Sequence, residues 1–106
     1  MTDVIYSYTL EQAIEDGILA IPFDNNVLKL MMKHVDNKPI IATAHLFGDL
    51  DGEQLLDIWD KFIKWRKEVM PTLPEEYRMF SLEVNGKKVW VDETPYQVTL
   101  MYTEDY

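Results

Sequence analysis

The spacing of apolar residues changes along the chain, from a helical period in the first two thirds to a strand period near the end. The helical period is clearest over residues 52–69, where apolar side chains recur every three or four positions. Asp51, followed three positions later by Gln54, fits a capping box at the start of this segment. We therefore predict a long helix over residues 52–69.

A shorter helix is predicted over residues 10–16. Thr9 and Gln12 form a second capping-box pattern, and Gly17 is placed to end the helix. Residues 18–22 follow as a short extended apolar run that is suited to an edge strand.

The next helix is predicted to begin at Asp24 or Asn25 and to continue to about His34. Asn37 and Pro39 would end it. Residues 40–47 are too short and too apolar for periodicity to decide between a buried strand and a short helix capped by Thr43, and we favour the helix slightly.

The last third of the chain has the alternation of strands. The dipeptide Asn85-Gly86 lies between two β-rich runs and is the strongest short-range signal for a hairpin, because a type I′ turn needs positive φ at both central positions. A third run covers residues 96–102. The expected fold class is α+β, with N-terminal helices followed by a three-stranded antiparallel β-meander packed on the 52–69 helix.

Length and composition indicate one domain over residues 1–106, with 47% hydrophobic residues to build its core. The net charge is -9, and it is unevenly distributed: residues 1–60 carry 11 acids and three bases, whereas residues 61–106 carry 8 acids and 7 bases. This acidic half disfavours direct binding to nucleic acid or to anionic membrane and permits a basic protein partner. Solubility alone would also account for the charge.

The residue types exclude several kinds of site. The chain has no cysteine, hence no disulfide or thiolate metal site. Met1-Thr2-Asp3 does not open a signal peptide and no transmembrane run is present, so a cytoplasmic protein is the default expectation.

No cofactor and no metal are expected. A zinc site would need both histidines, His34 and His45, together with carboxylates. Asp49 and Asp51 lie in a segment that is similar to a calcium loop, yet the spacing departs from the EF-hand pattern, and we interpret them as helix caps and surface charge. Weak calcium binding over residues 49–53 stays open.

Catalysis is not expected either. Carboxylate pairs could act as acid and base, but they fall on predicted exposed helix faces. No Ser-His-Asp set, phosphate-binding glycine loop or dinucleotide-binding signature is present. Trp59 and Trp65 lie six positions apart on one helix, so one is expected in the core and the other at an edge or interface.

Two segments carry a resemblance to an uncharacterised family. The sequence from Ile5 to Thr9, followed by Gln12-Ala13-Ile14-Glu15-Asp16-Gly17-Ile18-Leu19, is similar to the opening of small proteins of unknown function that are carried on bacterial plasmids and phages. Residues 98–105 resemble the closing strand and acidic end of that family. The resemblance implies an accessory protein of a mobile element in a prokaryotic cytosol, and it implies no activity or cofactor.

The leading hypothesis is a non-catalytic protein that binds and inhibits a basic nucleic-acid-processing protein of the host, as anti-CRISPR and anti-restriction proteins do. A homodimer, joined through an edge strand or an exposed tryptophan, and a small metal-dependent enzyme are the alternatives. The residues expected to bind the partner are acids of the first 60 residues: Glu15, Asp16, Asp49, Asp51, Glu53, Asp57 and Asp60.

Overall fold

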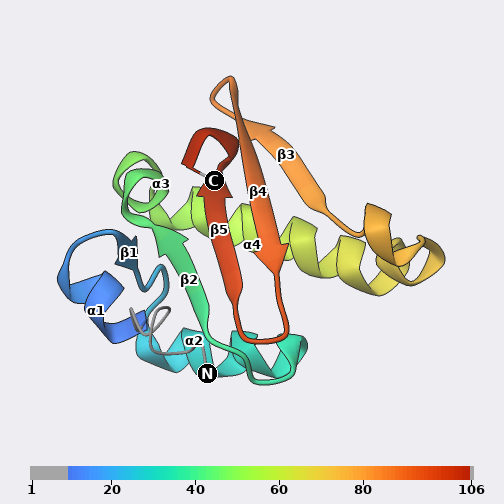
Figure 1. The fold of residues 1–106 in the computed structure, drawn as a ribbon, viewed down its shortest axis with the longest axis horizontal. Helices are drawn as coiled ribbons and strands as arrows, with labels where there is room; N and C mark the ends of the chain where they lie inside the picture. The colour runs from blue at the N-terminus through green and yellow to red at the C-terminus, as the bar shows by residue number, and fades with distance from the viewer. Residues whose placement is uncertain (1–9, 106) are drawn as a thin grey trace, which may run out of the picture.

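The computed structural model describes residues 10–105 as a mixed sheet with helices packed against it (Figure 1). The strands are β1 (Leu19–Ala20), β2 (Ile40–Thr43), β3 (Phe80–Val84), β4 (Lys87–Glu93) and β5 (Val98–Tyr102). The helices are α1 (Leu10–Glu15), α2 (Asn25–Met32), α3 (Ala44–Asp49) and α4 (Gly52–Glu68). Short 3₁₀ turns cover Lys33–Val35, Met70–Thr72, Glu75–Tyr77 and Thr103–Asp105.

The α+β class is confirmed, but the predicted three-stranded sheet is wrong. The sheet has five strands in the order β1-β2-β5-β4-β3. The antiparallel run of β3, β4 and β5 is present, and β2 adds to it parallel to β5 while β1 pairs antiparallel with β2. The last strand of the chain is therefore the middle strand of the sheet.

Residues 40–47 contain both elements that the sequence left open. Residues 40–43 form β2, and α3 begins directly after them with Thr43 as its N-cap, whose hydroxyl accepts from the backbone N–H of Leu46. Ile40, Ile41 and Ala42 are all buried, since both faces of this strand are covered. A strand buried on both faces shows no alternation, which is why its pattern did not reveal it.

The end of α1 follows the glycine signal. Gly17 has φ of +75°, its N–H donates to the carbonyl of Ile14, and the N–H of Ile18 donates to the carbonyl of Ala13. These two bonds form a Schellman motif, in which the left-handed residue reverses the chain into β1. The predicted cap at Thr9 lies outside the described residues.

Of the caps predicted for the two longer helices, the capping box of α4 is confirmed, whereas the cap of α2 lacks its side-chain hydrogen bond. Asp51 and Gln54 form the complete capping box at the start of α4. Asp24 is the N-cap residue of α2, but its side chain makes no capping hydrogen bond. Asp36 and Asn37 both have positive φ and turn the chain toward β2.

The hairpin of β3 and β4 is confirmed. Asn85 and Gly86 have φ of 53° and 81°, and Val84 pairs with Lys87 across the two-residue turn. This is the geometry of a type I′ turn.

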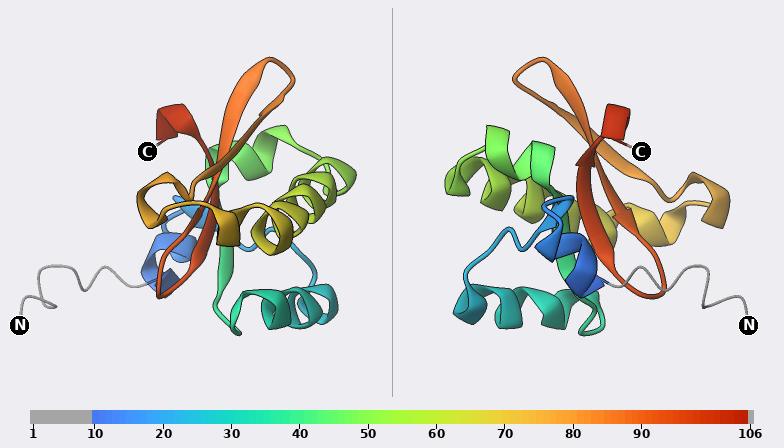
Figure 2. Two further views of the ribbon diagram at one scale, coloured as in Figure 1. Left: turned by 90° about the vertical axis from the view of Figure 1, so that its right-hand side faces the viewer. Right: turned by 60° about the vertical axis from the view of Figure 1, so that its left-hand side comes forward.

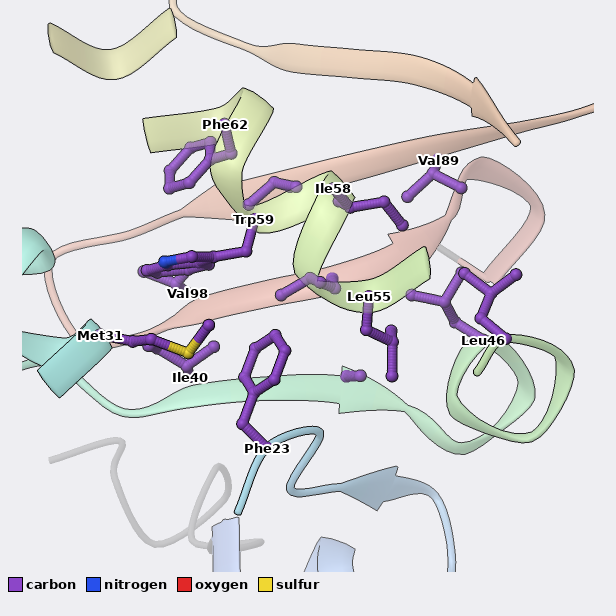
Figure 3. Packing of buried hydrophobic residues seen from close by; sticks show 14 of the residues in the cluster. Phe23, Met31, Ile40, Leu46, Leu55, Ile58, Trp59, Phe62, Val89 and Val98 are labelled. Atoms are coloured by element: carbon purple, nitrogen blue, oxygen red, sulfur yellow. The ribbon is translucent and has the colours of Figure 1, made fainter. Parts of the chain in front are cut away.

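The main core lies between the sheet and the layer formed by α2, α3 and α4, whereas α1 lies on the other side of the sheet (Figure 2). Leu55, Ile58, Trp59 and Phe62 project from α4 toward the strands, where Val89 and Val98 meet them (Figure 3). Trp59 is buried, and Trp65 is half-buried against the edge of this core. The prediction for the two tryptophans is therefore confirmed.

Candidate functional site

The acids expected to bind a partner do not form one surface. Glu15 and Asp16 lie at the end of α1, on the opposite side of the sheet from α4 (Figure 2). The other five lie at the end of α3 or on the first part of α4: Asp49, Asp51, Glu53, Asp57 and Asp60.

Asp49 and Asp51 have hydrogen-bond partners within the fold. The Oδ2 atom of Asp49 accepts a hydrogen bond of 3.0 Å from the hydroxyl of Tyr102. The Oδ1 atom of Asp51 accepts the backbone N–H of Gln54 at 2.8 Å, and the Gln54 side chain accepts the Asp51 N–H at 3.1 Å. Both carboxylates therefore have structural partners.

Glu53, Asp57 and Asp60 form a stripe on the solvent side of α4, which we call the acidic stripe. Their spacing of four and three residues places them within about 60° of arc on the helix. All three are exposed, and the buried side chains of α4 lie on the opposite side of the helix. The acidic stripe is therefore the most solvent-directed part of this helix.

The acidic stripe ends where basic residues begin. Lys61 forms an ion pair of 2.9 Å with Asp57, and both side chains are more than half exposed. Within residues 10–105, Glu53 and Asp60 have no ion pair. An exposed pair such as Asp57–Lys61 is easily exchanged for another partner.

An apolar groove borders the acidic stripe on the side of α2. We call it the α2/α4 groove; it has a volume of about 180 Å³ and is lined by Val27, Leu30, Met31, His34, Trp59 and Asp60. Leu30 is 62% exposed and Val27 is 38% exposed. Leu56 precedes Asp60 by one turn on α4 and is 40% exposed. Asp60 thus belongs to both the groove and the stripe.

Sequence reasoning missed a cluster around His45, which also contains Thr43, Asp49, Tyr102 and Asp105. The Nδ1 atom of His45 lies 3.0 Å from Asp105 Oδ1, and its Nε2 atom lies 3.5 Å from Asp49 Oδ2. The Thr43 hydroxyl donates to Asp105 Oδ2 at 3.0 Å. The imidazole packs edge-on against Tyr102 with ring centroids 4.8 Å apart. The cluster joins α3 to the segment after β5.

The charges in this cluster stabilise one another. The hydrogen bond with Asp105 raises the pKa of His45. Partial burial opposes ionisation of Asp105, but the bonds from His45 and Thr43 outweigh it and lower the pKa of Asp105. Burial and the hydrogen bond to Asp49 raise the pKa of Tyr102 to about 12. The imidazolium form of His45 is thus favoured between two carboxylates.

The His45 cluster lacks the arrangement of a nucleophilic site. Within the cluster, the Thr43 hydroxyl donates to Asp105 and not to the imidazole. A threonine nucleophile activated by His45 would donate its hydroxyl proton to the imidazole. In the described part of the chain, no three His, Asp or Glu side chains are placed to hold a metal ion.

A second cavity, of about 340 Å³, lies beside the C-terminal half of α4. One wall is an ion network in which Glu93 accepts from Arg66 through both carboxylate oxygens and from Lys38. Burial alone would raise the pKa of Glu93, but these two cations outweigh it and lower that pKa. Arg66 also donates to the carbonyl of His34. The network therefore ties the 3₁₀ turn after α2 to α4 and β4, and its charges are already paired.

Comparisons with known proteins add no assignment. A scan of protein-family models, a search of curated proteins and a search of solved structures each found no match to this chain. The family resemblance therefore stays an expectation. Over residues 10–105, no helix has the length and apolar character needed to cross a membrane.

Proposed function

We propose that this chain is a non-catalytic protein-binding module that docks on a basic surface of its partner through the acidic stripe. The observation that carries this proposal is the position of Glu53, Asp57 and Asp60, which share the solvent side of the longest helix. A rigid helix held by core packing presents these charges at fixed spacing, which favours electrostatic recognition.

The contrast between the acidic stripe and the other ionised groups supports binding over catalysis. The groups with shifted pKa values, such as His45 and Glu93, are engaged with partners inside the fold. Glu53 and Asp60 lack such partners among the described residues, so their charges are available to another molecule.

The partner class in the proposal is a nucleic-acid-processing protein of a host cell. Such proteins carry basic channels or grooves that bind phosphate, and a set of carboxylates can occupy the same surface. The family resemblance supports an origin on a phage or plasmid. Accessory proteins of such elements can act by inhibiting host proteins of this kind.

Charge density limits the strength of this interaction. Glu53, Asp57 and Asp60 span about 10 Å of helix, or roughly one charge per 5 Å. Duplex DNA carries one charge per roughly 1.7 Å of its axis. The acidic stripe is therefore too sparse to imitate a duplex by charge alone, and the partner needs further contacts.

The test compares three tagged proteins in pull-downs from a bacterial lysate, with bound proteins eluted by a salt step and identified by mass spectrometry. The proteins are the native chain, an E53Q/D57N/D60N variant, and an E75Q/E76Q/E83Q control, which removes three exposed acids elsewhere. We expect the native chain and the control to retain one nucleic-acid-processing protein that the stripe variant loses. Equal retention by all three proteins, or resistance to salt, would contradict the proposal.

Self-association is the second candidate, and the free edge of β3 favours it. β3 is the outermost strand of the sheet next to β4, so one side of its backbone has no strand neighbour among the described residues (Figure 1). An open edge can pair with the same edge of a second copy. Light scattering over a range of concentrations decides this, since a monomer throughout excludes a dimer through β3.

A further inference from the structure

The α2/α4 groove has a buried aromatic floor and an exposed apolar rim, two properties that are typical of a binding surface. Its floor contains Trp59, which is 3% exposed, while its rim exposes Leu30 and Val27 to solvent. Its volume is about 180 Å³. The groove therefore has room for a single anchoring side chain.

The charges at the groove are acidic on the side of α4. Asp60 lines the groove itself, and Glu53 and Asp57 continue the negative charge along the same helix. The lysine of α2, Lys29, projects about 100° around its helix from Leu30 and about 160° from Val27, on the side away from the groove. Among the described residues that line the groove, His34 is the basic one. A ligand in the groove thus meets apolar contacts with negative charge beside them.

We propose that the α2/α4 groove receives an apolar side chain from a basic amphipathic helix of the partner protein, an inference that rests on the proposed function. Exposed ion pairs contribute little binding free energy each, so the acidic stripe needs an apolar anchor to hold a partner. A helix lying along a groove between two helices presents anchors at intervals of three and four residues. Lysine or arginine on its flanks then faces Asp60 and Asp57.

The probe is a synthetic peptide of about 14 residues, or roughly four helical turns, with leucine at helical spacing and lysine elsewhere. Its matched control carries serine at every leucine position and has the same charge. Binding is measured by isothermal titration calorimetry at several salt concentrations. Amide chemical shifts of the labelled protein locate the bound peptide.

Leu30→Gln removes the exposed apolar side chain without introducing charge, and it keeps a good helix former. We expect it to weaken the leucine-lysine peptide about tenfold, because that peptide covers the side chain of Leu30. The control is Tyr96→Gln, at a side chain that is 81% exposed in the turn between β4 and β5. It should leave affinity unchanged, and the serine peptide should not respond to Leu30→Gln.

The E53Q/D57N/D60N variant separates this inference from the proposed function. We expect it to weaken binding and to flatten the salt dependence, while E75Q/E76Q/E83Q does neither. Sensitivity to charge without sensitivity to Leu30→Gln would overturn the groove and leave the proposed function standing. Sensitivity to Leu30→Gln without sensitivity to charge would overturn the basic partner and the proposed function with it.

The NMR experiment also distinguishes a second copy of the chain in the groove, or binding of the peptide elsewhere, from the proposed complex. Chemical shift changes that follow protein concentration without peptide, at Leu30 and Trp59, would show that a second copy fills the groove and would overturn the inference. Peptide-induced shifts that lie outside α2 and α4 would do the same. Shifts confined to Leu30, Trp59 and Asp60 support it.

Discussion

Arg66 holds Glu93 in a fork, with its Nε atom 2.8 Å from Oε1 and its Nη2 atom 2.9 Å from Oε2. Such paired bonds are the strongest geometry available to an arginine and a carboxylate. Lys38, two residues before β2, donates to the same carboxylate. The end of β4 is therefore fixed against two other elements.

Glu93→Gln should lower the free energy of unfolding at pH 7 by about 1–2 kcal/mol, because both partners are only partly exposed and would lose a charged acceptor. The pKa of Glu93 is lowered in the fold, so its contribution is present above the unfolded pKa and is lost as pH falls through the folded one. Urea unfolding at pH 7 and near pH 3 measures the free energy of unfolding of the native protein and of the variant. An equal difference between native and variant proteins at both pH values would contradict the ionic origin.

Asp105→Asn should lower the pKa of His45, since the bond to Asp105 is the main cause of its upward shift. A raised folded pKa means that the contact stabilises the fold fully below the unfolded pKa of His45 and is lost as pH rises through the folded value. An NMR titration of the His45 ring follows this directly. Asp49→Asn should lower the pKa by less, and Asp92→Asn serves as a control at a carboxylate outside the cluster.

Gly17→Ala should destabilise the protein by about 1 kcal/mol, because an alanine at φ of +75° is strained even though no atom lies near the added methyl group. Gly48→Ala is the matched change within α3, where φ is ordinary and the space is also open. It should stabilise by about 0.5–1 kcal/mol. Thermal unfolding of both variants tests the pair, and shifts of the same sign would contradict the account.

Asp51→Ala should cost about 1 kcal/mol of stability through loss of the capping box. Asp51→Asn keeps an oxygen that can accept the N–H of Gln54. It should therefore lower stability by only a few tenths of the amount expected for Asp51→Ala. Denaturant unfolding measures both. If Asp51→Asn weakens partner capture without lowering stability, then the charge of Asp51 also belongs to the docking surface; if it leaves capture unchanged, Asp51 is a cap alone.

Local signals in the sequence predicted local structure well. Asp51 with Gln54, Gly17, and Asn85 with Gly86 each act within a few residues, so their patterns could be recognised without knowing the fold. β1 lies at the edge of the sheet within residues 18–22, the run that was expected as an edge strand. β2 was left open, because a strand buried on both faces does not show the alternation by which a strand is recognised.

The candidate site also has a part that follows from local sequence spacing and parts that depend on the tertiary fold. Helical spacing alone puts Glu53, Asp57 and Asp60 on one face, so the acidic stripe could be predicted once α4 was recognised. The His45 cluster could not, because His45 and Asp105 are 60 positions apart and meet only through the pairing of β2 with β5. The α2/α4 groove likewise depends on how two helices pack.

The central position of β5 has a consequence for how the chain folds. The parallel pairing of β2 with β5 joins Ile40 to Val98, which lies 58 positions later in the chain. β4 also pairs with β5 on its inner side. Pairing across such a long loop is slow, because the entropy of closing it is lost before the contacts compensate. During synthesis, α2, α3 and α4 emerge with their apolar faces uncovered and gain a complete sheet only when the last strand arrives. A ribosome paused before residue 98 would therefore hold a collapsed but unfinished chain.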